Sequence, residues 1–317
     1  MDLITLAIPI YNVQAYVERA LLSALDQTHE AIEYLLVDDK GEDHSMHIVN
    51  GIIAAHPRGG AVKVVEHPAN LGLGAARNTA MDRANGEYLF FMDSDDAITP
   101  DCIEKLYQEM LRTGVDLVIG SFPGVTARKD RLVERDRERI VLSYFAKHAY
   151  IGACNKLYKT SFLRKNNIRC IHPIMEDNYF SLKVLLYARG YSLIPDVTYL
   201  RYPREDSITG GGGGNVQTFR QFPQMLTDMA RLIESALPEA SLRLKVKGKF
   251  FKRRWGIAEL AMQSPYNVRT YIRDYLSPTF LRDRDLVRSP FLFCAYILSI
   301  LPLWMKKVGL FIHIKLS

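Results

Sequence analysis

Short apolar runs recur at even intervals along the first half of the chain. The runs cover Leu3–Ile10, Tyr34–Val37, Val62–Val65, Tyr88–Met92 and Leu117–Ile119. They end at residues 10, 37, 65, 92 and 119, so successive ends lie 27 or 28 residues apart. That interval has room for one strand, one crossover helix and two loops, which is the size of a βα unit. The pattern therefore predicts an α/β fold with a doubly wound, mostly parallel sheet.

The segments between these runs carry helical patterns. Apolar residues three or four positions apart occur between residues 13 and 24 and between residues 103 and 111, the latter after the helix-start signal Thr99-Pro100-Asp101. In open α/β sheets, ligands bind beyond the carboxyl ends of the strands. The polar residues directly after each apolar run are therefore the first candidates for a functional site.

The second half of the chain is organised differently. Residues 123–145 are charge-rich and weakly patterned, which favours a surface excursion. The glycine run Gly210–Gly214 has the high chain entropy of a mobile loop or hinge. We therefore expect three parts: a first domain at residues 1–209, a glycine-rich hinge and basic helical region at 210–288, and an apolar tail at 289–317.

The tail contains a 15-residue apolar run, Phe291–Met305, followed by Lys306 and Lys307. At about 1.5 Å per residue, this run is too short for the roughly 30 Å hydrocarbon core of a bilayer. A helix lying in the membrane interface fits better, with basic residues near anionic headgroups. A helical domain that covers its own core is the alternative.

Charge separates the two halves of the chain. The 317 residues have a formal net charge of +6 and are 48% hydrophobic, which disfavours disorder and suffices for a sizeable core. Residues 201–317 hold 19 basic and 9 acidic residues, an excess that suits nucleic acid, anionic lipid or a phosphorylated substrate. The four cysteines form no CxxC pair and no basic and apolar leader opens the chain, so we expect reduced thiols and no secretory signal.

Three carboxylates follow one of the predicted strands. Asp93, Asp95 and Asp96 come directly after the apolar run Tyr88–Met92. Like charges this close repel unless a cation, a proton or an arginine neutralises them, and carboxylate oxygens are hard ligands suited to Mg²⁺ or Mn²⁺. The pattern indicates a site for a metal and a diphosphate. Helix-capping acids in a surface turn are the alternative.

Two further segments carry candidate ligands for a nucleotide. The acidic pair Asp38-Asp39 ends a strand, where one carboxylate can hold the loop and the other can accept from a nucleobase N–H such as that of uracil. A turn-forming pair before Gly41 is the alternative. Small residues from Gly72 to Ala76 would let Arg77 approach a diphosphate at a helix start, the alternative being an ordinary surface arginine.

A fourth candidate is the acidic pair Glu176-Asp177, which precedes a helix-like stretch. Asp177 is a candidate general base, because deprotonating a sugar hydroxyl needs a carboxylate within hydrogen-bond reach. First-turn acids favoured by the helix dipole are the alternative. The sequence shows no HExxH motif, no Cys/His zinc spacing and no serine or cysteine nucleophile elbow.

Several motifs, in this order and spacing, resemble glycosyltransferase family 2. They include Ile8-Pro9-Ile10-Tyr11-Asn12, Leu36-Val37-Asp38-Asp39, Ala76-Arg77-Asn78, Met92-Asp93-Ser94-Asp95-Asp96, Asn155-Lys156-Leu157-Tyr158 and Met175-Glu176-Asp177. The resemblance covers about residues 1–209. It implies a GT-A fold, in this chain followed by a C-terminal helical region. It also implies a nucleotide diphosphate sugar donor, a divalent metal (Mn²⁺ or Mg²⁺) and inversion at the anomeric carbon.

The resemblance also implies roles for single residues. Pro9, Tyr11 and Asp39 would frame the nucleobase, Arg77 would meet the donor phosphates, and Lys156 is a weaker candidate for phosphate. Asp93 and Asp95 would serve the ribose and the metal, Asp177 would be the base, and Glu176 would position it. Two departures from the family pattern are the segment Lys40-Gly41-Glu42-Asp43 and the irregular arginine-rich stretch at Arg201–Arg204.

We therefore expect an inverting glycosyltransferase of the hexosyltransferase type. It would move a sugar, most simply from a UDP-sugar, to a hydroxyl of a glycan or lipid-linked acceptor. The expected pathway is bacterial surface polysaccharide synthesis. We expect it in the cytoplasm, peripheral on the inner face of the cell membrane at an anionic surface, without a nucleic-acid partner. Alternatives are a non-catalytic sugar or nucleic-acid binding protein, which the basic half would favour, and a sugar nucleotidyltransferase. An aspartyl phosphatase is disfavoured because Asp96-Ala97 replaces the usual continuation of its motif.

Overall fold

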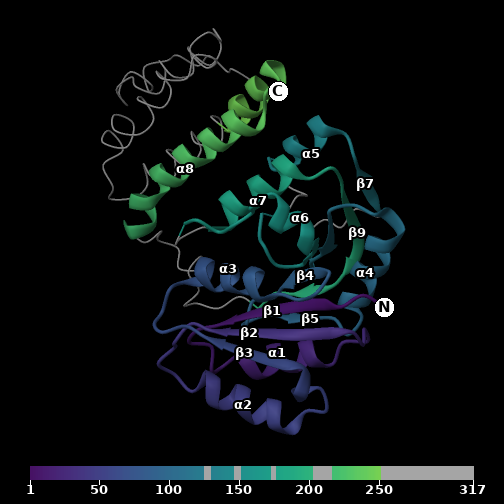
Figure 1. The fold of residues 1–317 in the computed structure, drawn as a ribbon, viewed down its shortest axis with the longest axis vertical. Helices are drawn as coiled ribbons and strands as arrows, with labels where there is room; N and C mark the ends of the chain where they lie inside the picture. The colour runs from purple at the N-terminus through teal and green to yellow at the C-terminus, as the bar shows by residue number, and fades with distance from the viewer. Residues whose placement is uncertain (125–129, 146–150, 173–175, 203–215, 251–317) are drawn as a thin grey trace. The chain divides into compact units, whose positions relative to one another are not determined.

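The computed structural model describes residues 1–124, 130–145, 151–172, 176–202 and 216–250. The chain divides into two compact units, Met1–Gly211 and Gly212–Ser317. All of the sheet lies in the first unit (Figure 1). The predicted tail at 289–317 and the glycine run at 210–214 lie outside the described residues.

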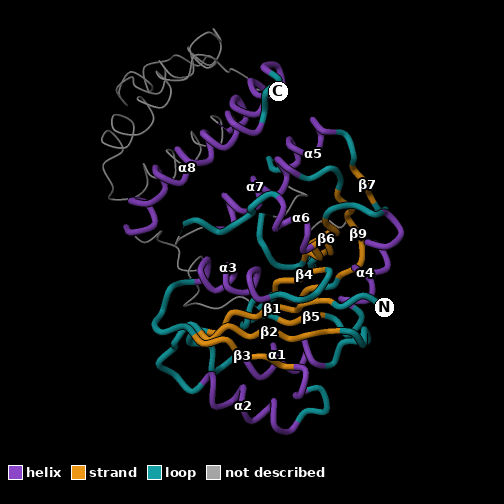
Figure 2. The backbone as a smooth tube through the Cα atoms, in the orientation of Figure 1, coloured by secondary structure: helices purple, strands orange, loops and turns teal. Residues whose placement is uncertain are grey.

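Within the described residues, eight strands form one mixed sheet (Figure 2). Their order is β3 (Val62–Glu66), β2 (Ile32–Asp38), β1 (Ile4–Ile10), β4 (Tyr88–Phe91), β8 (Lys156–Lys159), β6 (Leu117–Ser121), β9 (Tyr191–Val197) and β7 (Leu132–Glu134). The pairs from β3 to β4 are all parallel, as is the pair of β6 with β9. The five strands predicted from the apolar runs are all present, and the mostly parallel α/β fold is confirmed.

One strand runs against its neighbours in the middle of the sheet. β8 lies between β4 and β6 and is antiparallel to both. Because its direction is reversed, β8 begins at the edge of the sheet where β4 ends, and Phe91 and Cys154 form a bridge there. A short antiparallel pair of β5 (Ala97–Ile98) and β10 (Tyr199–Leu200) lies beyond that edge. This edge therefore collects segments from three distant parts of the chain, near residues 91–98, 154–156 and 199–200.

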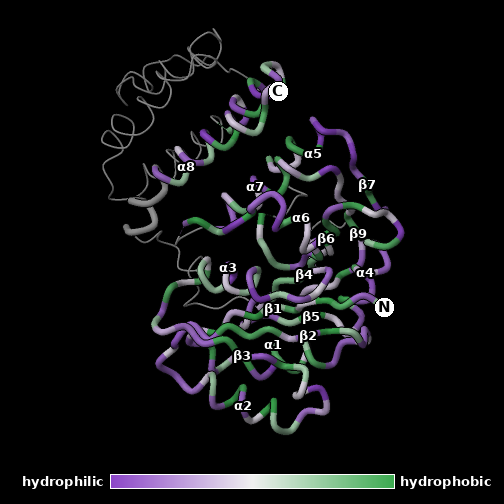
Figure 3. The backbone as a smooth tube through the Cα atoms, viewed as in Figure 1, coloured by the Kyte–Doolittle hydropathy of each residue, from purple (hydrophilic) through white to green (hydrophobic). Residues whose placement is uncertain are grey.

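Helices cover both faces of the sheet. They are α1 (Val17–Leu25), α2 (Ser45–Ala55), the 3₁₀ turn η1 (Gly59–Ala61), α3 (Leu73–Arg83), α4 (Cys102–Thr113), α5 (Arg137–Ser143), α6 (Thr160–Lys165) and α7 (Glu176–Tyr187). One hydrophobic core includes alternate residues of β1 together with buried residues of α1, α2 and α4. α3 contacts β1, β2, α6 and α7, on the other face of the sheet. Figure 3 shows hydrophobic stretches along β1 and β2.

The segment from 123 to 145 differs from the expected surface excursion. It contains the edge strand β7 and the helix α5, whose Ile140 and Val141 are buried. Asp136 caps α5 by accepting from the backbone N–H of Arg139 at 2.9 Å. The sequence pattern did not predict β7 and α5. A strand of three residues and a helix of about two turns are too short to show a clear hydrophobic period, and charged residues surround both.

The second unit is helical in its described part. α8 spans Val216–Ala236, and residues 240–250 form a further helix. Glu234 forms ion pairs with Arg243 and Lys247, so two residues of the predicted basic helical region face a partner on α8. In the described part of the chain, no helix has the length and apolar character needed to cross a bilayer.

Candidate active site

A buried arginine lies at the centre of the candidate site. Arg77, on α3, is only 1% exposed. One of its terminal nitrogens, Nη1, donates to Glu176 Oε1 at 2.6 Å and to Asp177 Oδ1 at 2.7 Å. The other, Nη2, donates to Asp93 Oδ1 at 2.9 Å. A single planar guanidinium therefore joins the acidic motif after β4 to the acidic pair at the start of α7.

Small residues at the start of α3 make this contact possible. A Cβ on Gly74 would lie 3.1 Å from the carbonyl oxygen of His172 and 3.4 Å from the Cβ of Glu176. Gly74 therefore allows the segment before α7 to pass close to α3. Asn78 holds the same segment, since its side chain donates to the Cys170 carbonyl at 2.7 Å and accepts from the Cys170 N–H at 2.9 Å. The small residues predicted at this helix start thus serve the approach of α7.

The acidic motif after β4 is divided between exposed and buried carboxylates. The side chain of Asp93 is 28% exposed, and its backbone N–H donates to the Tyr199 hydroxyl at 3.0 Å. Asp96 is buried and accepts from the Tyr202 N–H at 3.0 Å. Burial raises the pKa of Asp96 to about 6, and the neighbouring charges of Asp93 and Asp95 act in the same direction. The backbone carbonyl of Asp95 accepts from Arg19 at 2.6 Å.

The acidic pair lies in the first turn of α7, at the carboxyl edge of the sheet. Burial raises the pKa of Glu176 to about 7, against the lowering effect of Arg77. Burial also raises the pKa of Asp177, and again the positive charge of Arg77 opposes it. Asp177 Oδ1 additionally accepts from the backbone N–H of Ala153 at 3.0 Å, and its side chain is 27% exposed. Asp177 is thus a fixed, partly accessible carboxylate.

The predicted nucleobase residues lie at the ends of β1 and β2. Pro9 is buried within β1, whereas Tyr11, after the strand, is 42% exposed. Asp39 is 2% exposed and accepts from the backbone N–H groups of Leu71 at 2.9 Å and Gly72 at 2.8 Å. It therefore holds the loop before α3 in place. Its proposed contact with a nucleobase stays a prediction.

Asp39 is paired with His67, a polar residue after the third apolar run whose contact with Asp39 was not predicted. His67 Nδ1 lies 2.6 Å from Asp39 Oδ1, and His67 Nε2 lies 2.8 Å from the Thr79 hydroxyl. His67 directly follows β3, whose neighbour in the sheet is β2. Because adjacent parallel strands end at the same edge, the position of His67 after the third apolar run was the signal that could have found this pair.

The unusual segment after Asp39 is tied to the loop after β1. Asp43 accepts from the Gln14 N–H at 2.8 Å, and Asn12 accepts from the Glu42 N–H at 2.9 Å. Asn12 and Lys40 have positive φ angles of 50° and 56°. A Cβ on Gly41 would lie 2.7 Å from Asn12 Oδ1, so only glycine fits this close approach. The segment Lys40-Gly41-Glu42-Asp43, which departs from the family pattern, is therefore hydrogen-bonded to the loop that follows β1.

Lys156, the weaker phosphate candidate, is buried at the start of β8. It is 4% exposed, and its ammonium donates to the carbonyl oxygen of Gly152. Burial lowers the pKa of Lys156 to about 8. Its predicted contact with a phosphate is not tested by these contacts. Of the other predicted residues, Arg77, Asp93, Glu176 and Asp177 meet in one cluster.

The described residues do not contain a group of three His, Cys, Asp or Glu side chains placed to hold a metal ion. Magnesium, however, is generally held by one or two carboxylates together with substrate phosphates. Asp93 and the half-buried Asp95 supply such hard oxygen donors at the sheet edge. The donor set therefore fits a cation that is shared with a diphosphate.

An open α/β sheet, with an acidic motif after a central strand and a second acidic pair joined to it, is the arrangement of a GT-A glycosyltransferase. The family model described as "Glycosyl transferase family 2" matches residues 5–175. The chain therefore belongs to this family.

Relatives and a solved structure agree with this result. An uncharacterized glycosyltransferase of Haemophilus influenzae is 38% identical over 122 residues, which cover 38% of this chain and 48% of the relative. The poly(ribitol-phosphate) beta-glucosyltransferase of Bacillus spizizenii is 30% identical over 211 residues, covering 64% and 32%. The chain therefore spans about a third to a half of these relatives.

The crystal structure of S. aureus TarS 1–349 in complex with UDP-GlcNAc is similar in fold. Its TM-score to this chain is 0.70 at 22% sequence identity, and the match covers 94% of this chain and 88% of that one. At this identity the likeness supports the fold, and it supports the arrangement of the mixed sheet described above.

Proposed function

We propose that this protein is an inverting glycosyltransferase that moves a sugar from a nucleoside diphosphate sugar, in the simplest case a UDP-sugar, to a hydroxyl of a glycan or lipid-linked acceptor. The observation that carries the proposal is the Arg77 cluster. It brings Asp93, from the acidic motif, and Asp177, the candidate base, onto one guanidinium. The relatives named above, and the nucleotide sugar bound to TarS, support this class of donor and acceptor.

The chemistry follows from where the carboxylates lie. In a direct displacement, the acceptor hydroxyl attacks the anomeric carbon from the face opposite the leaving nucleoside diphosphate. Asp177 would take the proton of the hydroxyl, while Asp93 and Asp95 would lie at the diphosphate side. Tyr11 and Asp39 would frame the nucleobase, Tyr11 by its exposed ring. Inversion follows because no enzyme nucleophile intervenes between donor and acceptor.

A divalent cation fits the diphosphate side of this site. Asp95 and Asp93 would hold it together with the donor phosphates, where it would supply positive charge beside the leaving group. Arg77 is already committed to three carboxylates, so it would fix the geometry of the acidic motif. In this proposal Arg77 acts on the reaction through the carboxylates that it holds.

The first experiment measures UDP binding by calorimetry with and without MnCl₂. We expect binding that depends on the metal, and we expect Asp95→Ala to weaken the metal-dependent affinity at least tenfold, or about 1.4 kcal/mol. Asp82→Ala, at an exposed carboxylate on α3, is the control and should bind as wild type. Tight, metal-independent UDP binding by Asp95→Ala would refute the metal role.

We also propose that the tail brings the enzyme to an anionic membrane surface, where a lipid-linked acceptor would be located. This proposal rests on the sequence of residues 289–317. Each large apolar side chain contributes roughly 1.5–3 kcal/mol if fully buried, and each nearby Lys or Arg adds about 1 kcal/mol on an anionic surface. Deleting 289–317 should therefore abolish sedimentation with phosphatidylglycerol vesicles while UDP binding persists. Equal sedimentation of both chains would contradict the proposal, and loss of UDP binding would place the tail in the folded core.

A further inference from the structure

The turn before β8 is held by two side chains of the strand that follows it. The Lys156 ammonium donates to the carbonyl oxygen of Gly152. The Tyr158 hydroxyl donates to the carbonyl oxygen of Ala153 at 3.0 Å. Lys156 and Tyr158 are two positions apart on one strand, so their side chains leave the same face of the sheet. Between the two carbonyls lies the N–H of Ala153, which donates to Asp177.

The residue between this turn and β8 fixes where the turn can lie. Asn155 is fully buried and has a φ of 56°, a left-handed conformation that asparagine tolerates better than most residues. Its side chain donates to the Ser121 carbonyl at 3.2 Å and accepts from the Thr198 hydroxyl at 2.7 Å. The turn is therefore anchored to β6 and to the segment before β10, and its peptides have little freedom.

We propose that Lys156 and Tyr158 are positioning residues for the general base: they fix the Gly152–Ala153 turn so that the Ala153 N–H orients the Asp177 carboxylate. The inference rests on the proposed function, because it gives a role to partners of the base in that reaction. Asp177 is then held from two directions, by Arg77 on one side and by the turn on the other. A carboxylate held in this way keeps its lone pairs directed without reorganisation during the reaction.

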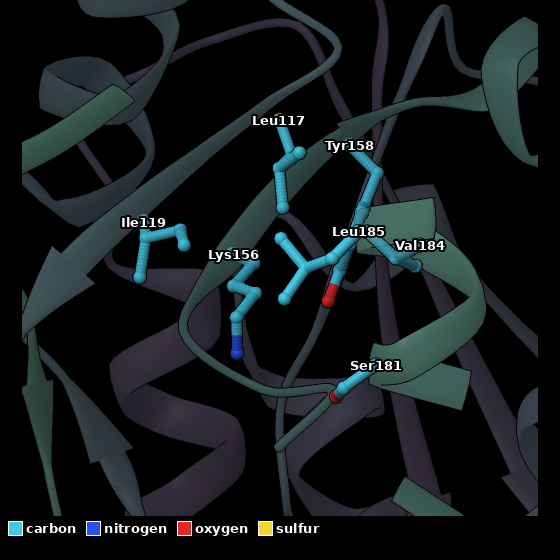
Figure 4. A pocket seen from close by; sticks show the side chains of 7 residues that line it. All are labelled: Leu117, Ile119, Lys156, Tyr158, Ser181, Val184 and Leu185. Carbon is cyan, nitrogen blue, oxygen red and sulfur yellow. The ribbon is translucent and has the colours of Figure 1, made fainter. Parts of the chain in front are cut away.

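The surroundings of Lys156 support a specific role for its charge. The side chain lines a small apolar cavity with Leu117, Ile119 and Leu185 (Figure 4). An ammonium in such a place costs free energy, which a neutral residue would avoid. The positive charge acts on Asp177 and, with Arg77, favours its ionised form. Lys156 thus acts on the base through the turn, and its charge acts in the same direction as that of Arg77.

Replacing Lys156 should have different effects under this role and under the phosphate-binding role that the family resemblance implies. A lysine that binds the donor phosphates would, on removal, weaken UDP binding. A lysine that positions Asp177 would, on removal, leave UDP binding intact and lower turnover. The two roles are therefore separated by measuring binding and turnover on the same variants.

The experiment compares full-length wild type with Lys156→Met and Tyr158→Phe. UDP affinity in the presence of MnCl₂ is measured by calorimetry. The kcat and its pH profile are measured by UDP release from a panel of UDP-sugars. Hydrogen exchange of the Ala153 amide is measured by NMR. We expect UDP affinity to stay unchanged in both variants. The kcat should be lower by about 10-fold to 100-fold in Lys156→Met and by a smaller factor in Tyr158→Phe. The Ala153 amide should exchange faster in both. The acidic limb of the Lys156→Met profile should move to higher pH, because losing a nearby positive charge raises the pKa of Asp177.

Lys159→Met is the matched control, since Lys159 lies on the same strand and donates to the Gly114 carbonyl at 2.7 Å, away from Asp177. Wild-type kcat and an unshifted pH profile in Lys156→Met would overturn the proposal, as would unchanged exchange of Ala153 in both variants. Tyr158→Phe removes a single hydroxyl, so it tests the turn if Lys156→Met does not fold. A wild type that releases UDP from no UDP-sugar would instead count against the proposed function, and the amide exchange would still decide whether the two side chains hold the turn.

Discussion

Asp177→Asn is expected to lower kcat by about 10²–10⁴-fold while UDP affinity stays within twofold of wild type. The amide keeps the size of the side chain and can still accept from Arg77 and from the Ala153 N–H. It cannot take a proton from the acceptor hydroxyl. The loss should therefore fall on turnover, and steady-state kinetics together with UDP calorimetry would show it.

The pH dependence of the wild type has a defined sign. A general base works in its ionised form, and burial raises the pKa of Asp177, the proposed base, above its usual value. Activity should therefore fall as the pH is lowered through that raised pKa, and Asp177→Asn should lose this acidic limb. Glu18→Gln, at a first-turn acid of α1, is the control and should behave as wild type. Unchanged turnover of Asp177→Asn at saturating substrate would refute the role of base.

Arg77→Met is expected to destabilise the first unit by about 3–5 kcal/mol at neutral pH, the usual cost of removing one partner from a buried ion pair. The substitution leaves Asp93, Glu176 and Asp177 close together without their shared cation. The cost should shrink at lower pH, because protonating these carboxylates removes their repulsion. Urea unfolding at pH 5 and pH 7.5 would measure both effects.

A surface arginine provides the comparison for Arg77. Arg169 pairs with Asp82, whose side chain is 58% exposed, so Arg169→Met should cost about 0–1 kcal/mol. If Arg77→Met unfolds at the same urea concentration as Arg169→Met, the Arg77 cluster does not stabilise the fold. Equal destabilisation at both pH values would show that packing, and not charge, is lost.

The sequence predicted the first five apolar-run strands of the fold well, because each βα unit is local. The apolar runs found β1, β2, β3, β4 and β6, since strand and helix periods differ within a few residues. It did not predict β8 between β4 and β6. Four residues with a lysine at each end carry no clear period, and the pairing of β8 depends on partners dozens of residues away.

The candidate site was predicted as separate motifs. Asp93, Asp95, Asp177 and Arg77 could each be found from their position after an apolar run or before a helix. The contacts of Arg77 with Glu176 and Asp177 could not be predicted, because these residues lie 99 and 100 positions away along the chain. The sequence also could not predict that Lys156 is buried, because most lysine side chains in proteins are exposed.

The long separation between Arg77 and its partners on α7 has a consequence for synthesis of the chain. Domains fold from the amino terminus as they emerge from the ribosome, and contacts distant in sequence form after local ones. When Arg77 and Asp93 emerge, the partners at 176 and 177 have not yet been made. Of the three ion pairs of Arg77, only the one with Asp93 can then form early, and those with Glu176 and Asp177 form last. A nascent or truncated chain ending before residue 176 would hold the proposed donor side of the site without the proposed base, Asp177.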